Sequence, residues 1–209
     1  MKKAAWITIG ILSILVGLYP ITYFLVDREF GLLSTKSAEL LSNQLWNIAF
    51  YGHIIPGGLA LLIGWLQFSQ KLRKKNIKLH RTIGKTYVIS VLISGFCGLF
   101  IALYATGGII SITGFFSMGL IWLSTTFLGF QAIKKGNIRL HETFMIYSYA
   151  ACFAAVTLRI WLPILIIVMG EFIGAYRIVA WLCWAPNMII AYFIVKKKYP
   201  QINLLLVRT

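Results

Sequence analysis

The feature that most constrains this chain is a series of apolar runs, each long enough to cross a bilayer as a helix. A hydrocarbon layer about 30 Å thick needs about 20 apolar residues per helix. Backbone groups inside lipid must pair within the structure, which favours helices over irregular chain. The sequence therefore predicts an all-α bundle of six transmembrane helices forming a single membrane domain, with spans at about 5–26, 45–68, 84–105, 109–133, 143–168 and 176–195.

The composition excludes the main soluble classes. Apolar residues make up 59% of the chain and charged residues 12%, whereas soluble globular domains carry about 25% charged residues. This hydrophobicity also excludes an intrinsically disordered chain. The first run follows Lys2 and Lys3 but is too long for the apolar part of a signal peptide, so we expect a retained span.

The cations predict the orientation. The chain has 20 Lys and Arg residues against 5 Asp and Glu, a formal net charge of +15. Segments 2–3, 71–85, 134–139 and 196–208 hold sixteen of these cations, and the opposite side holds only Arg28, Lys36, Arg159 and Arg177. The cytoplasmic loops of membrane proteins typically carry an excess of Lys and Arg over the loops on the other side. We therefore expect the cation-rich segments, and with them both termini, to lie in the cytoplasm. The cations do not share a soluble module, which argues against nucleic acid as a partner.

A short motif occurs twice. Asn76–Thr82 reads NIKLHRT and Asn137–Thr143 reads NIRLHET, with five of seven positions identical and an offset of 61 residues. Both copies precede a span that starts on the cation-rich side, which predicts a parallel repeat in which spans three and four correspond to spans five and six. Each Asn is in position to cap the helix that follows it.

The motif also places two histidines at one depth. His80 and His141 lie at the same end of spans three and five, and neighbouring spans would let them ligate one haem iron. Arg81 and Arg139 would then bind the propionates. The alternative is that both histidines only mark the start of a helix, where polar residues cost little. The sequence contains no CxxCH, CxxC or HExxH pattern that would indicate another metal or redox site.

A second candidate site lies nearer the opposite side. His53 and Arg159 fall inside spans two and five, and ionisable residues within a membrane are functional candidates. Pro56 and Pro163 follow them closely and are expected to kink the helices there. Trp184 and Asn187 of span six have similar depths, so the sequence predicts a ligand pocket of His53, Arg159, Trp184 and Asn187.

Several of these segments together resemble a bacterial membrane family, the domain of unknown function 2306, over about residues 45–195. The resemblance rests on His53 with Pro56-Gly57-Gly58, Leu79–Tyr87, Arg139–Glu142, Ala155–Arg159 and Ala180–Asn187. It implies a multi-pass protein of the bacterial plasma membrane and implies no activity. A likeness to b-type membrane cytochromes is weaker, because three single histidines can supply at most one bis-histidine haem.

Three functions fit these observations. The first is a redox protein that binds haem b at His80 and His141 and a quinone near His53 and Arg159. The second is a carrier or receptor for an anionic or amphiphilic small molecule. The third is a structural subunit of a membrane complex, with another membrane protein as its partner. The sequence leaves open whether the protein is an enzyme.

Overall fold

The computed structural model describes residues 3–25 and 31–201, and within these residues every regular element is helical. Six stretches are long and apolar enough to cross a membrane, which confirms the predicted number and class of elements. The shorter elements are the 3-10 turn η2 (Gly31–Thr35) and the helices α3 (Ala38–Ser42) and α5 (Gln70–Lys75). The predicted positions Lys2, Val26, Arg28 and Arg208 lie outside the described residues.

Two of the six spans are single helices and four are divided. The undivided spans are α6 (Ile77–Ala102) and α7 (Ile109–Lys134). The divided spans are α1 (Lys3–Leu18), η1 (Tyr19–Ile21) and α2 (Thr22–Leu25); α4 (Gln44–Gly64) and η3 (Trp65–Phe68); α8 (Ile138–Cys152) and α9 (Ala154–Met169); α10 (Phe172–Leu182) and α11 (Ala185–Lys198). Pro56 and Pro163 lie inside α4 and α9.

Three predicted span boundaries are corrected. The third, fifth and sixth spans were expected to begin at 84, 143 and 176, but their helices begin at Ile77, Ile138 and Phe172. The physical reason is capping, because side chains of Asn76, Asn137 and Glu171 accept backbone N–H groups of the first turn. A helix therefore starts at its cap, several residues before its apolar run does.

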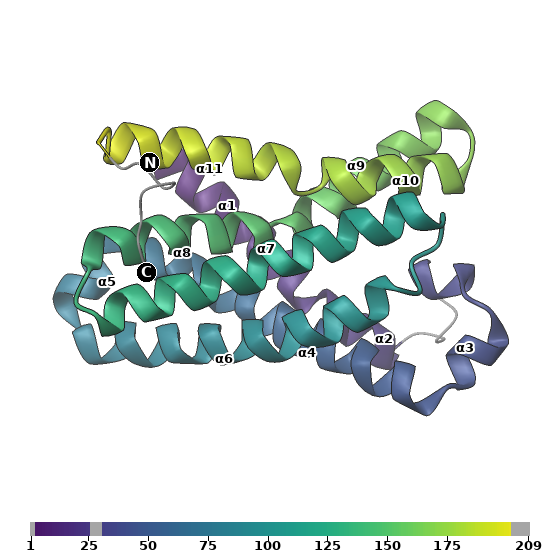
Figure 1. The fold of residues 1–209 in the computed structure, drawn as a ribbon, viewed down its shortest axis with the longest axis horizontal. Coiled ribbons are helices and arrows are strands. Elements are labelled where there is room, and N and C mark those ends of the chain that lie inside the picture. Colours follow the sequence, from purple (N-terminus) through teal and green to yellow (C-terminus); the bar gives the residue numbers. More distant parts are fainter. Residues whose placement is uncertain (1–2, 26–30, 202–209) are drawn as a thin grey trace.

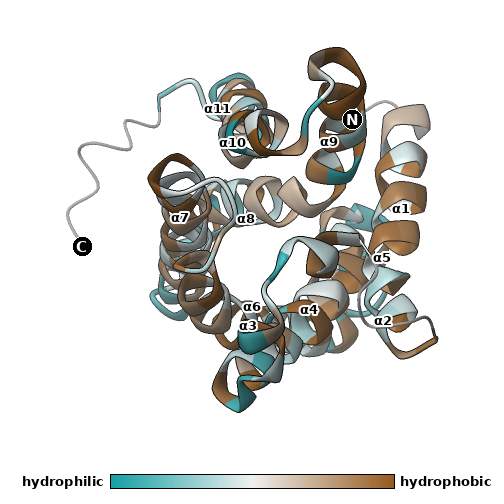
Figure 2. Ribbon diagram, turned by 90° about the vertical axis from the view of Figure 1, so that its right-hand side faces the viewer, coloured by the Kyte–Doolittle hydropathy of each residue, from teal (hydrophilic) through white to brown (hydrophobic). Residues whose placement is uncertain are grey.

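Helices α4, α6, α7 and α8 form the centre of the bundle, each packed against the next, with α8 also in contact with α4 (Figure 2). Helix α1 packs on α4, α10 packs on α7 and α9, and α11 packs on α8. The start of α1, helix α5, the end of α7 and the end of α11 lie at one end of the molecule (Figure 1). We call this the basic end, because it carries Arg73–Lys75, Lys134, Lys135 and Lys196–Lys198.

Candidate functional site

The two Asn caps place both copies of the motif at the basic end. Asn76 Oδ1 accepts the Leu79 N–H at 2.9 Å, and Asn137 Oδ1 accepts the Leu140 N–H at 3.0 Å. The predicted caps are therefore confirmed. Each cap fixes the first turn of a span, so that His80 and His141 face the interior of the bundle at its basic end. The equivalence of the two helix pairs as a parallel repeat stays a prediction.

A cavity of about 580 Å³ opens between these first turns, and we call it the basic cavity. Its lining includes five cationic side chains from four helices and a single carboxylate, Glu142. The cations are Arg73, Arg81, Lys85, Lys134 and Lys198. Other parts of the wall are apolar or aromatic, among them Phe68, Val88, Phe130, Met145 and Tyr149. The cavity thus combines excess positive charge with an apolar interior.

Both motif histidines line the basic cavity. His141 Nδ1 lies 2.8 Å from the Gly129 carbonyl oxygen; a carbonyl can only accept, so Nδ1 carries the proton and Nε2 is left as the basic nitrogen. His80 Nδ1 is buried and has no hydrogen-bond partner, and the same is true of Gln67 Nε2 in the same wall. The wall of the basic cavity therefore contains two buried polar atoms that have no hydrogen-bond partner among the described residues.

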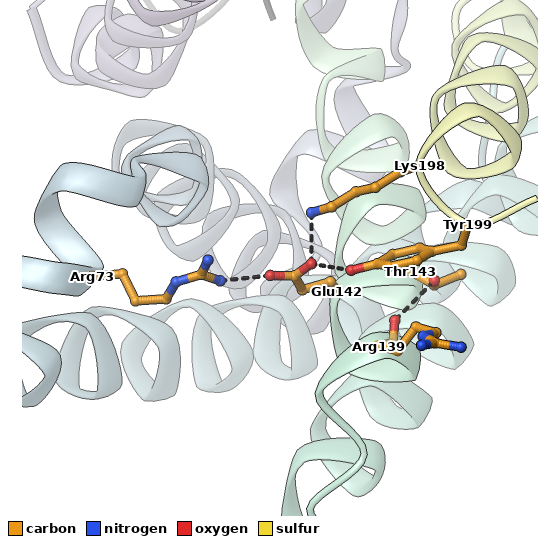
Figure 3. Close-up of polar contacts among 6 residues, drawn as sticks. All are labelled: Arg73, Arg139, Glu142, Thr143, Lys198 and Tyr199. Carbon is orange, nitrogen blue, oxygen red and sulfur yellow. Dashed lines mark hydrogen bonds and ion pairs between the residues drawn. The ribbon is translucent and has the colours of Figure 1, made fainter.

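Only one of the two predicted propionate-binding arginines reaches this cavity. Arg81 is in the lining, whereas Arg139 is not. The Arg139 guanidinium carbon lies 5.8 Å from the centroid of the Tyr199 ring, and its side chain points away from Glu142 (Figure 3). The reason is tertiary, because Tyr199 follows α11 and provides an aromatic face that attracts a cation.

Glu142 joins three elements at the basic end (Figure 3). Its carboxylate accepts hydrogen bonds from Arg73 of α5 at 2.5 Å, from Lys198 of α11 at 2.6 Å and from the Tyr199 hydroxyl. Burial and the bond to this carboxylate raise the pKa of Tyr199. The sequence did not reveal this cluster, since its members are about 60 residues apart and no motif connects them.

The second candidate site is a cavity of about 240 Å³ farther from the basic end, which we call the Arg159 cavity. It is lined by His53 and Arg159 together with aromatic and small residues, among them Tyr19, Trp46, Phe115, Gly57 and Gly98. The structure thus brings together two ionisable residues from different spans. Gly98 leaves room for the imidazole, because a Cβ there would lie 2.7 Å from His53 Nδ1.

Arg159 is only partly paired. Its Nη1 donates to the Ala155 carbonyl at 2.9 Å, and its guanidinium carbon lies 4.3 Å from the Tyr19 ring centroid. Its Nε is buried without a partner. His53 Nδ1 donates to the Ser94 carbonyl at 2.9 Å, which leaves Nε2 as a possible acceptor.

The other two residues predicted for this pocket are not in its lining. The Asn187 amide donates to the carbonyls of Ala150 and Cys183 and to the Thr157 hydroxyl. Trp184 Nε1 donates to the Ala180 carbonyl at 3.0 Å. Both side chains therefore satisfy backbone groups near the breaks in spans five and six. Similar depth along the membrane normal does not establish that side chains face the same space.

A buried polar network lies between the two cavities. Tyr87, which lines the basic cavity, pairs with Ser148 at 2.8 Å, and Ser148 pairs with Thr126 at 2.6 Å. Trp122, which lines the Arg159 cavity, lies with its Nε1 3.5 Å from the Tyr87 hydroxyl. The network satisfies hydroxyl groups deep in the bundle, where unpaired polar atoms are costly. Sequence reasoning missed it, because Ser and Thr are common at helix interfaces in membranes.

Metal sites built from three or more His, Cys, Asp or Glu side chains do not occur in the described ranges 3–25 and 31–201. Cys97, Cys152 and Cys183 are all free thiols.

Comparison with known proteins identifies a family. The model of a family described as "Predicted membrane protein (DUF2306)" matches residues 50–195. No curated protein and no solved structure matches the chain. This description gives a location and no activity, so the function has to be inferred from the two cavities.

Proposed function

This chain belongs to the DUF2306 family of predicted membrane proteins. We propose that it binds an anionic amphiphile, which a membrane protein can take up from the bilayer, and that it holds this ligand in the basic cavity. The charged head group would contact the cations at the mouth, and the apolar part would lie among Phe68, Val88 and Phe130. We further propose that the basic end faces the cytoplasm of a bacterial cell, in keeping with the positive-inside rule.

The observation that carries this proposal is the charge balance of the basic cavity. Five cations face it, and the only carboxylate in its lining already pairs with two of them. Four of the five residues are exposed at the mouth of the cavity, and positive charges that converge on one mouth repel one another unless an anion compensates them. Orientation alone would require only that cations lie at this end, as Lys196 and Lys197 do, outside the lining. The unpartnered donor Gln67 Nε2 adds a reason to expect an acceptor in the cavity.

The proposal is tested with dihexanoyl phosphatidic acid as the probe and dihexanoyl phosphatidylcholine as the zwitterionic comparison, each titrated into the detergent-purified protein. We expect saturable binding of the acid, weakened about tenfold or more in the double variant Arg81→Gln/Lys85→Gln. Lys196→Gln/Lys197→Gln is the matched control, because it removes the same charge from the same end outside the cavity. Equal losses in both double variants would refute a site in the cavity.

A narrower second candidate is haem b, which is itself an anionic amphiphile. It is favoured by the two imidazoles in one cavity, since a phospholipid would not need them. His141 fits a ligand role, because its Nδ1–H is oriented by the Gly129 carbonyl and its Nε2 is basic. Arg81 and Lys85 would bind the propionates, and the bound haem would supply one-electron redox chemistry. A quinone near His53 and Arg159 would be its redox partner.

The absorption spectrum separates the two candidates. Haemin titrated into the purified protein should give a bis-histidine spectrum that is lost in both His80→Ala and His141→Ala. The alanine variants should bind phosphatidic acid as the wild type does if the natural ligand is a lipid. A spectrum without a saturable Soret change would remove the haem candidate and leave the first proposal standing.

A further inference from the structure

The Arg159 cavity contains a positive charge that no described carboxylate compensates. The charged residues in its lining are Lys36 and Arg159, and no Asp or Glu of the described ranges lines it. Lys36 is occupied, since its Nζ donates to the Tyr104 carbonyl at 2.6 Å and the Thr106 hydroxyl at 2.9 Å. Arg159 is different, because it lies inside a span and makes a single hydrogen bond within the described residues, to its own helix.

The free-energy cost of keeping the Arg159 charge and its unused donors inside the membrane indicates that a ligand binds there. A guanidinium has five donor hydrogens in a rigid fork. The Ala155 carbonyl takes one of them, while the Nε donor is buried without a partner. A charge in the membrane interior without a counter-charge is costly, and the ring of Tyr19 offsets only part of that cost. An anionic oxygen placed in the cavity would compensate the charge and the donors together.

A second orphan donor lies in the same wall. Trp46 Nε1 is buried without a partner and lines the Arg159 cavity. Its indole comes from α4, whereas Arg159 comes from α9, so the two residues line the cavity from different spans. Indole N–H groups only donate. Two unpaired donors on different helices both require an acceptor, and neither requires a further donor.

The size and walls of the cavity limit what that acceptor belongs to. A volume of about 240 Å³ is smaller than a typical drug-sized pocket of about 300–1,000 Å³. The walls include Phe50, Phe115, Met118 and Tyr176, which suit an apolar or aromatic body. Carboxylates match the fork of an arginine with two parallel hydrogen bonds.

We propose that the Arg159 cavity is a second ligand site, which binds a compact apolar carboxylate with its anionic group on Arg159 and Trp46. The site does not depend on the function proposed for the basic cavity. It differs from a quinone site in one respect, because a neutral carbonyl would leave the charge of Arg159 uncompensated.

Benzoate tests this site, with benzamide as its neutral isostere, by calorimetric titration of the detergent-purified protein. We expect saturable benzoate binding, at least about tenfold weaker in Arg159→Gln, and no saturable benzamide binding. Arg177→Gln is the matched control, since Arg177 lies toward the same end, is exposed and is absent from the lining. No benzoate binding to the wild type, equal binding by Arg159→Gln, or equal binding of benzamide would each overturn the proposal.

Two further variants keep the test decisive if Arg159→Gln does not fold. Arg159→Lys keeps the charge without the fork and should weaken benzoate binding severalfold. Trp46→Phe removes the indole donor while keeping an aromatic ring, and it should weaken benzoate binding about threefold or more. The double variant Arg81→Gln/Lys85→Gln should leave benzoate affinity unchanged. Weaker benzoate binding by this double variant would assign benzoate to the basic cavity and overturn the proposal of a separate site. Phosphatidic acid binding should be unchanged in Arg159→Gln, which keeps the two proposals distinguishable.

Discussion

Gly58 lies where the backbones of α1 and α4 meet, and replacing it by alanine should push these helices apart. A Cβ at position 58 would lie 2.6 Å from the Gly17 carbonyl oxygen and 3.0 Å from Pro20 Cγ. The first neighbour is backbone, so no change of rotamer can relieve the overlap. An ordinary contact begins near 3.4 Å, so α1 would have to move by about 0.8 Å to accept the methyl group.

The expected cost follows from two opposing effects. Overpacking of a tight interface costs about 1–3 kcal/mol, and the better helix propensity of alanine returns up to about 1 kcal/mol. Together these effects allow a loss of about 0–3 kcal/mol, and we expect Gly58→Ala to lower the free energy of unfolding by about 1–2 kcal/mol, the middle of that range. In a chain of this length, that corresponds to a Tm lower by about 2–8 °C. The shift would also move Tyr19, whose ring lies over Arg159.

Gly84→Ala is the matched control. A Cβ there would meet only the Gln67 side-chain oxygen at 3.5 Å, which is an ordinary contact. This variant should unfold at the wild-type temperature or slightly above it. Unfolding can be followed in detergent with a thiol-reactive fluorescent dye, because Cys152 and Cys183 are buried in the folded state. A Gly58→Ala protein that melts no lower than Gly84→Ala would refute the close-contact argument.

Three other perturbations have definite expected outcomes. Asn76→Ala and Asn137→Ala each remove a helix cap and should lower stability by about 1 kcal/mol, measured by the same dye assay; unchanged melting would contradict the capping role. Glu142→Gln leaves two cations of the basic cavity without their carboxylate, so phosphatidic acid should bind a few-fold more tightly in calorimetric titration. Weaker binding would instead mean that the carboxylate is needed to form the site. Ser148→Ala removes the centre of the buried hydroxyl network and should cost about 1–3 kcal/mol. Thr125→Val, whose hydroxyl bonds only carbonyls of its own helix, should cost less, and equal costs would argue against the network.

Features that depend on one segment of chain could be predicted. The six spans follow from apolar length, and the caps at Asn76 and Asn137 follow from residue type at the start of a span. Even so, three span boundaries were misplaced, because hydropathy locates where a helix enters lipid and a cap locates where the helix begins.

Site membership was predicted only in part. His53 and Arg159 do line one cavity, whereas Asn187 and Trp184 use their donors on nearby carbonyls. Depth can be estimated from position along a helix, but the direction of a side chain depends on which neighbouring groups remain unpaired. Arg139 illustrates the same point, since the partner that attracts it is a ring that follows α11.

The sequence by itself determined that this chain is an α-helical membrane protein with six spans, because the bilayer acts on each segment separately through its hydropathy. The distribution of its +15 charge predicts one cation-rich face. Only the tertiary structure decided that five of these cations surround a single cavity, that Glu142 joins three elements and that Arg159 faces a second cavity without a described carboxylate. These features depend on contacts between helices, and the same apolar pattern is compatible with many rotations of each helix in lipid.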